Sequence, residues 1–290
     1  MYIVPGSSSP GLSRELQKQL SAKDFNVKLA DVMYKRFPDG ENYVRIMSDL
    51  TGSDVLVVQA TKTDSEIIEL FLLVDAIREF NVKRLCIVIP YFGYARQDKK
   101  FLSGEPISAR AIAKRIELFI DDVVVIDIHS PLVVKNFSKP VHELTGMYEI
   151  GAFLKTLEPD ILLSPDVGAV KRVEIAANIV GCPWDYLEKT RVDAEHVIVK
   201  AKELKVEGKK VAIVDDIIST GGTIYTASIQ LKSLGAKAVY AACIHGLFRG
   251  SALEKLWSVC ERIISTDTVE NETSVVSVAP EIAKWVINNM

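Results

Sequence analysis

Two adjacent acidic residues, followed by a short glycine-containing loop, are the part of the sequence that most directly suggests chemistry. Asp215 and Asp216 end the apolar run 211–214, and Ser219-Thr220-Gly221-Gly222-Thr223 follows before a predicted helix. Backbone N–H groups at a helix N-terminus favour phosphate, and glycine lets the backbone approach it closely. Carboxylates accept hydrogen bonds from hydroxyl groups. A sugar phosphate satisfies both halves of this segment, whereas an acid pair that caps a turn is the alternative interpretation.

Polar side chains also follow other apolar runs. Asp127 and His129 end one run, and their spacing of two residues predicts that they project to the same side of a strand. Asp166 follows another run. Magnesium prefers oxygen ligands, so a direct bond from His129 to this metal would be unusual chemistry. A structural histidine is the alternative.

Three further segments, which are charged or form turns, are candidates for ligand binding or catalysis. "YARQDKK" (94–100) is either a triphosphate clamp at a strand end or a solvated run of charges. Lys189 and Arg191, two residues apart in a polar segment, can face one side of an extended loop, and a surface loop is the alternative. "RFPDGENYVRI" (36–46) predicts a turn between two extended segments, for which an ordinary hairpin is the alternative.

The elements that must position these residues are predicted from short runs rich in Val and Ile. Such runs, with little strict alternation, indicate strands that are covered on both faces, and hence parallel sheets flanked by helices in an α/β fold. The predicted strands are 54–60, 84–92, 122–129, 160–166, 210–216 and 238–248. The predicted helices between them are 65–80, 106–119, 168–180 and 222–234.

An internal repeat suggests how these elements are organised. Residues 54–92 can be laid on 210–248 at an offset of 156 residues, as strand, polar loop, helix and strand. This favours two similar α/β domains in tandem, 1–145 and 146–290, although any two units of this kind look alike. A predicted C-terminal helix, 279–289, is expected to pack back on the first domain.

Composition limits the function classes. The net charge of −3 argues against nonspecific nucleic-acid binding. The four cysteines show no C-x-x-C spacing and indicate a reducing compartment. There is no signal-peptide pattern and no apolar run of roughly 20 residues that could span a membrane, so we expect a cytoplasmic protein. Helix 65–80 is apolar around much of its circumference, and a subunit partner on its outer side is preferred to complete burial.

The motifs together point to one family. "VAIVDDIISTGGT" resembles the phosphoribosyl-diphosphate loop of the type I phosphoribosyltransferase fold. Over nearly its whole length the chain resembles the ribose-phosphate diphosphokinases, also called phosphoribosyl-diphosphate synthetases, in their compact archaeal form. The motifs that carry the resemblance, in the family's order, are "RFPDGE", "PYFGYARQDKK", "DIHS", "SPDVGA" and "EKTR". The resemblance implies two phosphoribosyltransferase-type domains.

The resemblance also implies an activity and its residues. The reaction is Mg2+-dependent transfer of the diphosphoryl group of ATP to the C1 hydroxyl of ribose 5-phosphate, a transferase step in nucleotide biosynthesis. The implied ATP residues are Phe37, Asp39, Gly40, Glu41, Arg96 and Gln97. The implied metal residues are His129 and Asp166, the catalytic residues Lys189 and Arg191, and the ribose 5-phosphate residues Arg191, Asp215, Asp216, Ser219, Thr220, Gly221, Gly222 and Thr223.

The resemblance also implies an oligomer, and the sequence differs from the usual family pattern at two positions. The segment 37–41 would contact the adenine of ATP bound to a neighbouring subunit, so a homo-oligomer, at least a dimer, is expected. Ser130 stands where the family usually has Ala, and Ser219 stands where many members carry an acid. One alternative is a phosphoribosyltransferase that consumes phosphoribosyl diphosphate, against which "RFPDGE" and "EKTR" argue. A second is a non-catalytic regulatory relative, against which the intact Lys189, Arg191, Asp215 and Asp216 argue.

Overall fold

The computed structural model describes residues 1–191, 197–200 and 205–290, and the side chains of residues 1–187 and 205–290. The chain forms two compact units. Unit 1 comprises Met1–Thr145, Thr268–Glu270 and Ser277–Met290, and unit 2 comprises Gly146–Asp267 and Asn271–Val276. The sequence predicts a second domain over all of 146–290, apart from the expected return of the last helix. The structure returns two segments, 268–270 and 277–290, to unit 1.

Unit 1 is built on a six-stranded parallel sheet with the strand order β2-β1-β5-β6-β7-β8. Its strands are β1 (Tyr2–Pro5), β2 (Lys28–Leu29), β5 (Asp54–Val58), β6 (Arg84–Ile89), β7 (Asp122–Ile126) and β8 (Val141–Leu144). Every side chain from Val123 to Val125 is fully buried, as expected for a parallel strand covered on both faces.

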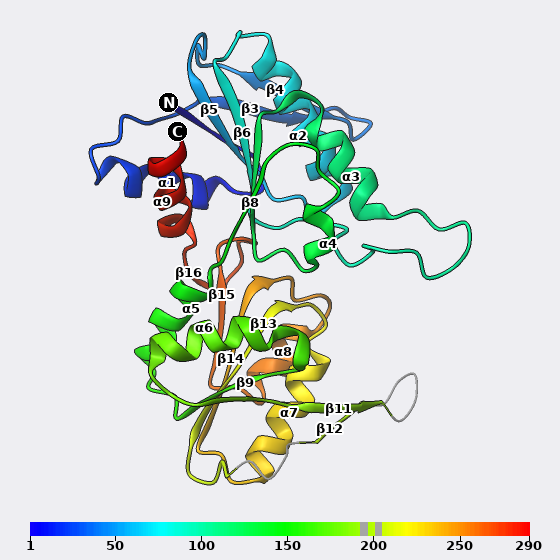
Figure 1. Ribbon diagram of the computed structural model, residues 1–290, viewed down its shortest axis with the longest axis vertical. Helices are drawn as coiled ribbons and strands as arrows, with labels where there is room; N and C mark the ends of the chain where they lie inside the picture. The colour runs from blue at the N-terminus through cyan, green and yellow to red at the C-terminus, as the bar shows by residue number, and fades with distance from the viewer. Residues whose placement is uncertain (192–196, 201–204) are drawn as a thin grey trace. The chain divides into compact units, whose positions relative to one another are not determined.

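Helices flank this sheet, and one antiparallel hairpin forms a separate two-stranded sheet beside it (Figure 1). The helices of unit 1 are α1 (Pro10–Ser21), α2 (Asp64–Arg78), α3 (Ser108–Ile116), the 3-10 helix η1 (Glu117–Phe119), α4 (Pro131–Val134) and α9 (Ala279–Asn289). The hairpin joins β3 (Val32–Arg36) to β4 (Asn42–Ile46). The long segment between β6 and α3 projects as a loop (Figure 1).

Helix α2 begins with a complete capping box, which explains why a largely apolar segment starts as a helix at this point. The Thr63 hydroxyl accepts a hydrogen bond from the Glu66 N–H, and the Glu66 carboxylate accepts one from the Thr63 N–H. The helix buries one side in the core, while Ile68 and Leu72 remain 50% and 37% exposed. A subunit partner on this outer side stays a prediction.

Unit 2 repeats the same sheet. Its six parallel strands have the order β10-β9-β13-β14-β15-β16. The strands are β9 (Ile161–Ser164), β10 (Trp184–Tyr186), β13 (Lys210–Ile218), β14 (Ala238–Gly246), β15 (Arg262–Thr266) and β16 (Ser274–Val276). The helices are α5 (Met147–Lys155), the 3-10 helix η2 (Val167–Ala169), α6 (Val170–Val180), α7 (Gly222–Ser233) and α8 (Ala252–Trp257). An antiparallel pair, β11 (Glu188–Arg191) and β12 (Val197–Lys200), precedes β13.

The two sheets share their topology strand for strand. In each unit the first strand pairs with the second and the third, an antiparallel hairpin lies between the second and third strands in the chain, and the remaining strands follow in order. The repeat read from the sequence, 54–92 on 210–248, aligns β5-α2-β6 with β13-α7-β14. The α/β class with two parallel sheets flanked by helices is therefore confirmed.

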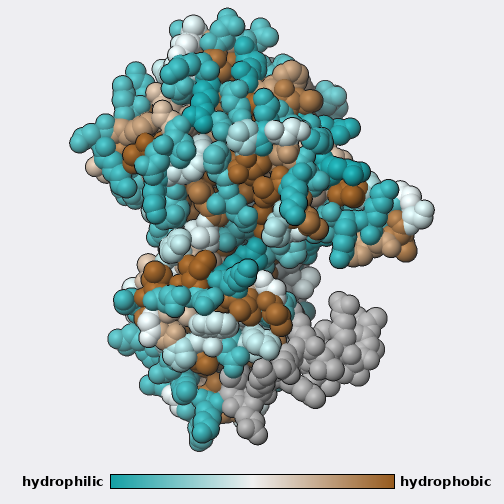
Figure 2. All heavy atoms as spheres, viewed as in Figure 1, coloured by the Kyte–Doolittle hydropathy of each residue, from teal (hydrophilic) through white to brown (hydrophobic). Residues whose placement is uncertain are grey.

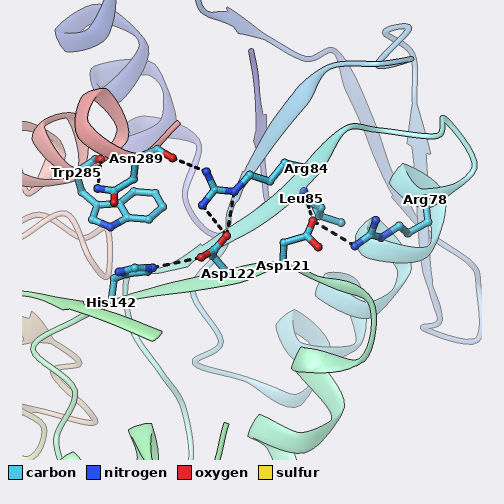
Figure 3. Close-up of polar contacts among 8 residues, drawn as sticks. All are labelled: Arg78, Arg84, Leu85, Asp121, Asp122, His142, Trp285 and Asn289. Carbon is cyan, nitrogen blue, oxygen red and sulfur yellow. Dashed lines mark hydrogen bonds and ion pairs between the residues drawn. The ribbon is translucent and has the colours of Figure 1, made fainter. Parts of the chain in front are cut away.

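The C-terminal helix α9 is attached to unit 1 by a cluster of polar and aromatic side chains at the beginning of two strands (Figure 3). The Arg84 guanidinium donates to Asp122 Oδ2 from Nε at 3.0 Å and from Nη2 at 2.6 Å, and it also donates to the backbone oxygen of Asn289. The other carboxylate oxygen, Asp122 Oδ1, lies 3.3 Å from Nε2 of His142, and the His142 ring lies against Trp285 of α9 with centroids 5.0 Å apart.

The segment 268–270 is attached by a second polar contact. The Glu270 carboxylate accepts hydrogen bonds from the N–H groups of Gly11 and Leu12, at 2.7 and 3.0 Å, in the first turn of α1. These N–H groups have no partner within the helix, and a negative charge at a helix N-terminus is favourable. A residue near the end of the chain therefore caps the first helix.

The hydrophilic and hydrophobic residues at the surface are distributed as expected around two buried cores. On the face seen in Figure 2, hydrophilic residues cover most of unit 1, and hydrophobic residues are gathered in smaller areas. Among the described residues, no helix is long and apolar enough to cross a membrane.

The Arg84–Asp122 pair generates a stability prediction. Asp122 is 8% exposed, so Arg84→Met leaves a nearly buried carboxylate without its cation. We expect this variant to lose about 2 kcal/mol of unfolding free energy, somewhat less than for a fully buried pair because Arg84 is partly exposed. The measurement is urea unfolding followed by circular dichroism. Lys83→Met is the control, because the Lys83 side chain is 72% exposed. Equal midpoints for the two variants would contradict this role of the pair.

Candidate functional site

The loop after β13 in unit 2 is supported by backbone hydrogen bonds. The carbonyl of Ile218 accepts from the N–H groups of Leu247 and Phe248, and the carbonyl of Ser219 accepts from Arg249 at 2.8 Å. The end of β13 and the loop that follows β14 are thus held together. The predicted ligand loop, Ser219 to Thr223, starts from a fixed strand end.

Gly221 makes the turn from this strand into α7. Its φ of 70° is left-handed, a conformation that other residues rarely adopt, and an added Cβ would lie 3.2 Å from the Leu256 side chain. Thr220 and Gly222 are exposed, and Ser219 and Thr223 are half-buried. Within the described residues, no side chain caps the N-terminus of α7. The N–H groups of the first turn of this 12-residue helix are therefore suited to an external anion.

The two acids of the opening motif have different surroundings. Asp216 is 6% exposed, whereas Asp215 is half-buried. Asp215 Oδ1 accepts the N–H of Asp216 at 2.9 Å, and Asp216 Oδ1 accepts the N–H of Ile217 at 2.9 Å. Burial raises the pKa of Asp215 well above its usual range, and the neighbouring charge of Asp216 raises it further.

A cation that the sequence analysis did not single out lies beside these acids. Nη1 of Arg172, in the first turn of α6, lies 3.4 Å from Oδ2 of Asp216. The sequence placed a helix over 168–180 but contains no pattern that pairs a helix residue with an acid on a strand 44 positions later. Only the packing of α6 beside β13 reveals the contact.

Asp166 lies at the end of the neighbouring strand, because β9 pairs with β13. It begins the 3-10 helix η2, where its Oδ1 accepts the N–H of Gly168 at 2.9 Å. Its charge also contributes to the raised pKa of Asp215, after burial and the effects of Asp216. The structure thus brings three of the predicted site residues, Asp166, Asp215 and Asp216, to the carboxyl ends of two adjacent strands.

The chemistry of Asp166 fits Mg2+, which is commonly bound by one or two carboxylates together with substrate phosphates. Across the described residues, no group of three His, Cys, Asp or Glu side chains is arranged to hold a metal ion by itself. His129 is exposed and offers a nitrogen, which magnesium disfavours.

In unit 1, the end of β7 corrects one prediction from the sequence. The spacing of Asp127 and His129 predicted that both project to the same side of one strand. However, β7 ends at Ile126, and Asp127 has a left-handed φ of 39°, so the two-residue alternation does not apply there. Asp127 is 4% exposed and accepts a hydrogen bond from the Thr145 hydroxyl at 2.8 Å, whereas His129 is exposed. Asp127 is a structural residue of unit 1.

The "YARQD" loop after β6 is tied to its surroundings at several points. The Gln97 side chain accepts a hydrogen bond from the Ser108 hydroxyl at the start of α3, and Asp98 accepts one from the hydroxyl of Ser130. Arg96 is exposed. Ser130, the residue after His129, departs from the family pattern, and its hydroxyl links this loop to the start of α4. The same hydroxyl accepts the N–H of Leu132 as the cap of α4.

The predicted adenine segment forms the tip of the β3–β4 hairpin. The N–H of Phe37 donates to the carbonyl of Glu41, and Gly40 has a φ of 94°, so a true turn is present. Phe37 is 47% exposed, with its ring at right angles to that of Tyr43, and Asp39, Gly40 and Glu41 are also exposed. An aromatic face and two acceptors are thus displayed together at the tip.

The predicted catalytic residues lie in the antiparallel pair that precedes β13. Lys189 and Arg191 belong to β11, which pairs with β12 so that Lys189 lies opposite Val199 and Arg191 opposite Val197. Their side chains lie outside the described residues. Their assignment as catalytic residues stays a prediction.

Comparisons with known proteins identify the class of this fold and site. A family model for the N-terminal domain of ribose phosphate pyrophosphokinase matches residues 1–119, and one for the phosphoribosyl transferase domain matches residues 150–281. The chain is therefore a two-domain enzyme of the transferase class, with a phosphoribosyl transferase domain in its second half.

Individual relatives narrow this class to one family. The chain is 41% identical to ribose-phosphate pyrophosphokinase 2 of Archaeoglobus fulgidus, over 98% of this chain and 99% of that protein. It is 43% identical to the ribose-phosphate pyrophosphokinase of Methanosarcina mazei, over 87% and 85% of the two chains. The crystal structure of phosphoribosylpyrophosphate synthetase from Mycobacterium smegmatis superposes with a TM-score of 0.85, at 29% identity, covering 100% of this chain and 99% of that one. The chain belongs to the ribose-phosphate pyrophosphokinase family, which confirms the resemblance found in the sequence.

The burial of Asp215 generates a prediction about pH. Because the folded protein raises the pKa of this carboxyl group, ionising it opposes folding, and that cost is complete only above the folded pKa. We expect Asp215→Asn, measured in EDTA without ligands, to melt a few degrees higher than the wild type at pH 8. The difference should shrink as the pH falls towards about 3.9, the ordinary pKa of Asp. Glu174→Gln, an exposed acid on α6, is the control. Equal melting temperatures of Asp215→Asn and the wild type at pH 8 would contradict this interpretation.

Proposed function

We propose that this protein transfers the diphosphoryl group of ATP to the C1 hydroxyl of ribose 5-phosphate in a Mg2+-dependent reaction, giving 5-phosphoribosyl 1-diphosphate and AMP for nucleotide biosynthesis. The observation that carries the proposal is the end of β13, where carboxylates lie beside an uncapped helix N-terminus. The membership of the chain in the ribose-phosphate pyrophosphokinase family supports it.

Unit 2 supplies the acceptor site in this proposal. The 5-phosphate binds at the loop Ser219 to Thr223, where the hydroxyls and the N–H groups of α7 donate hydrogen bonds. The ribose hydroxyls donate to the acids at the end of β13. The acids and the 5-phosphate are separated by the length of the pentose, so the repulsion between carboxylate and phosphate is avoided.

Unit 1 supplies donor contacts. Phe37 offers a ring face to adenine, and Asp39 and Glu41 offer acceptors for its exocyclic amine, with Gly40 making the turn between them. Arg96 is exposed on a loop that is fixed on either side, and a guanidinium is well suited to phosphate. Gln97 is held near it by Ser108.

The resemblance to the family implies an oligomer, and the exposed aromatic ring and two acceptors at the hairpin tip are compatible with a contact to a ligand bound by a second subunit. We therefore propose a homo-oligomer, at least a dimer, in which residues 37–41 of one chain meet the adenine bound to its neighbour. The exposed Ile68 and Leu72 of α2 offer apolar area for such a contact.

Magnesium and the cations complete the proposal. His129 would contact a metal or metal–phosphate group, and Asp166 would contribute to a second Mg2+ site; Mg2+ at these sites would neutralise charge on the phosphates. Lys189 and Arg191 stabilise the charge that develops on the transferring group, because phosphoryl transfer depends mainly on positioning and on electrostatic stabilisation. Arg191 also contacts ribose 5-phosphate.

The nucleotide product tests this function. Purified protein is incubated with Mg-ATP and ribose 5-phosphate, and the nucleotides are separated by chromatography. We expect AMP together with phosphoribosyl diphosphate, because diphosphoryl transfer breaks the bond between the α- and β-phosphates. ADP as the product would overturn the proposal. Absence of turnover would favour a regulatory subunit, and consumption of phosphoribosyl diphosphate with a nucleobase would favour a phosphoribosyltransferase.

A substitution tests the catalytic assignment separately. Lys189→Ala should lower kcat by at least about 100-fold, the usual loss for one group that stabilises a transition state, while ribose 5-phosphate binding is nearly unchanged. Binding is measured by calorimetry and kcat by AMP release. Lys205→Ala, which removes an exposed lysine, should match the wild type. A normal kcat with weakened binding would show that Lys189 has a different role.

A further inference from the structure

The first turn of α6 brings a sheltered cation to the acid pair of β13. Nη1 of Arg172 lies 3.4 Å from Oδ2 of Asp216, and the two side chains are only 19% and 8% exposed. Ion pairs exposed to water contribute little, but breaking a sheltered pair leaves an uncompensated charge. Lys171, the adjacent cation on the same helix, is exposed. The contact therefore depends on the position of Arg172 and not on the charge of the helix.

The contacts of Asp216 distinguish it from Asp215. Asp216 Oδ2 faces Arg172, and its Oδ1 accepts the N–H of Ile217, so protein groups hold both carboxylate oxygens. Asp215 is less buried, and its Oδ1 accepts the N–H of Asp216 at 2.9 Å. The two acids are thus unequal in exposure and in what fixes them. Asp215 is the one better placed to meet a ligand.

The charges at this strand end show why a fixed cation is useful. Asp166, Asp215 and Asp216 place three carboxyl groups at the carboxyl ends of two adjacent strands, and the proposed ligand brings a phosphate as well. Without Arg172, the Asp216 side chain would lose the contact that orients Oδ2, and the repulsion between its charge and Asp215 would increase. Arg172 reduces the repulsion on the side of Asp216 that faces α6.

We propose that Arg172 is a positioning residue of the ribose site, which holds Asp216 by an ion pair so that Asp215 is the acid presented to the sugar hydroxyls. This inference rests on the proposed function, because ribose 5-phosphate is the ligand that the two acids receive. Arg172 acts through Asp216 and does not itself take part in the transfer.

The test measures ribose 5-phosphate binding by calorimetry, without nucleotide, in the full-length protein. Arg172→Met should raise the Kd by about tenfold or more, because the sheltered ion pair that orients Asp216 is lost. Arg172→Lys should recover part of the affinity. The control Lys171→Met removes the same charge one residue earlier and should bind as the wild type does. At saturating ribose 5-phosphate, kcat and the KM for ATP should change by no more than about threefold, since the transfer groups remain.

A double-mutant cycle tests whether Arg172 acts through Asp216. Asp216→Asn removes the acid, and Arg172→Met added to this variant should weaken binding little further, because the partner is already absent. If Arg172→Met fails to fold, as shown by its thermal transition, the comparison of Arg172→Lys with Arg172→Lys/Asp216→Asn carries the same test.

The outcomes separate this inference from the proposed function. A wild-type protein that does not bind ribose 5-phosphate overturns the proposed function. A wild-type protein that binds it, with an unchanged Kd in Arg172→Met or an equal loss in Lys171→Met, overturns the role of Arg172. The role of Arg172 is also overturned if the losses of ribose 5-phosphate affinity are fully additive in the double-mutant cycle, or if kcat collapses while the Kd is unchanged.

Discussion

All six strands of each sheet run in the same direction, and the rest of the structure depends on this constraint. Parallel strands place their carboxyl ends, and the N-termini of the helices that follow, along a single edge. Residues far apart in sequence therefore meet there: Asp166 from β9 and Asp215 from β13, which are neighbours in the sheet of unit 2. The apolar runs can stay nearly free of polar residues because the functional groups lie just beyond them.

The same sheet topology supports different features in the two units. In unit 2, β13 carries two acids near its carboxyl end and is followed by a helix with an uncapped N-terminus, α7. In unit 1, the corresponding strand β5 leads to a helix whose N-terminus is closed by its own capping box, Thr63 with Glu66. One unit thus keeps a helix N-terminus available for an anion, and the other satisfies it internally. The hairpin inserted before that strand in unit 1 carries an exposed aromatic tip instead.

Much of this arrangement could be predicted from the sequence, because buried parallel strands and glycine-containing turns depend on local residue patterns. The run ending at Val214, the turn at Gly221 and the two-unit repeat are of this kind. Asp127 is different: its left-handed backbone follows no glycine or turn signal in the sequence, and its buried carboxylate accepts a hydrogen bond from Thr145, which lies 18 residues later. The partner of Arg172 also could not be predicted, because it depends on how α6 packs beside β13. Long-range contacts between single polar side chains leave no periodic pattern in a sequence.

The attachment of α9 to unit 1 has a consequence for the way the chain is made. Unit 1 is a discontinuous domain, because Glu270 caps α1 and Trp285 packs on His142 from segments that follow most of unit 2 in the sequence. Unit 2 lies almost wholly between those segments, so unit 1 cannot form all of its contacts until most of unit 2 has been synthesised. A truncation before residue 277 would therefore remove part of the domain that contains residues 1–145.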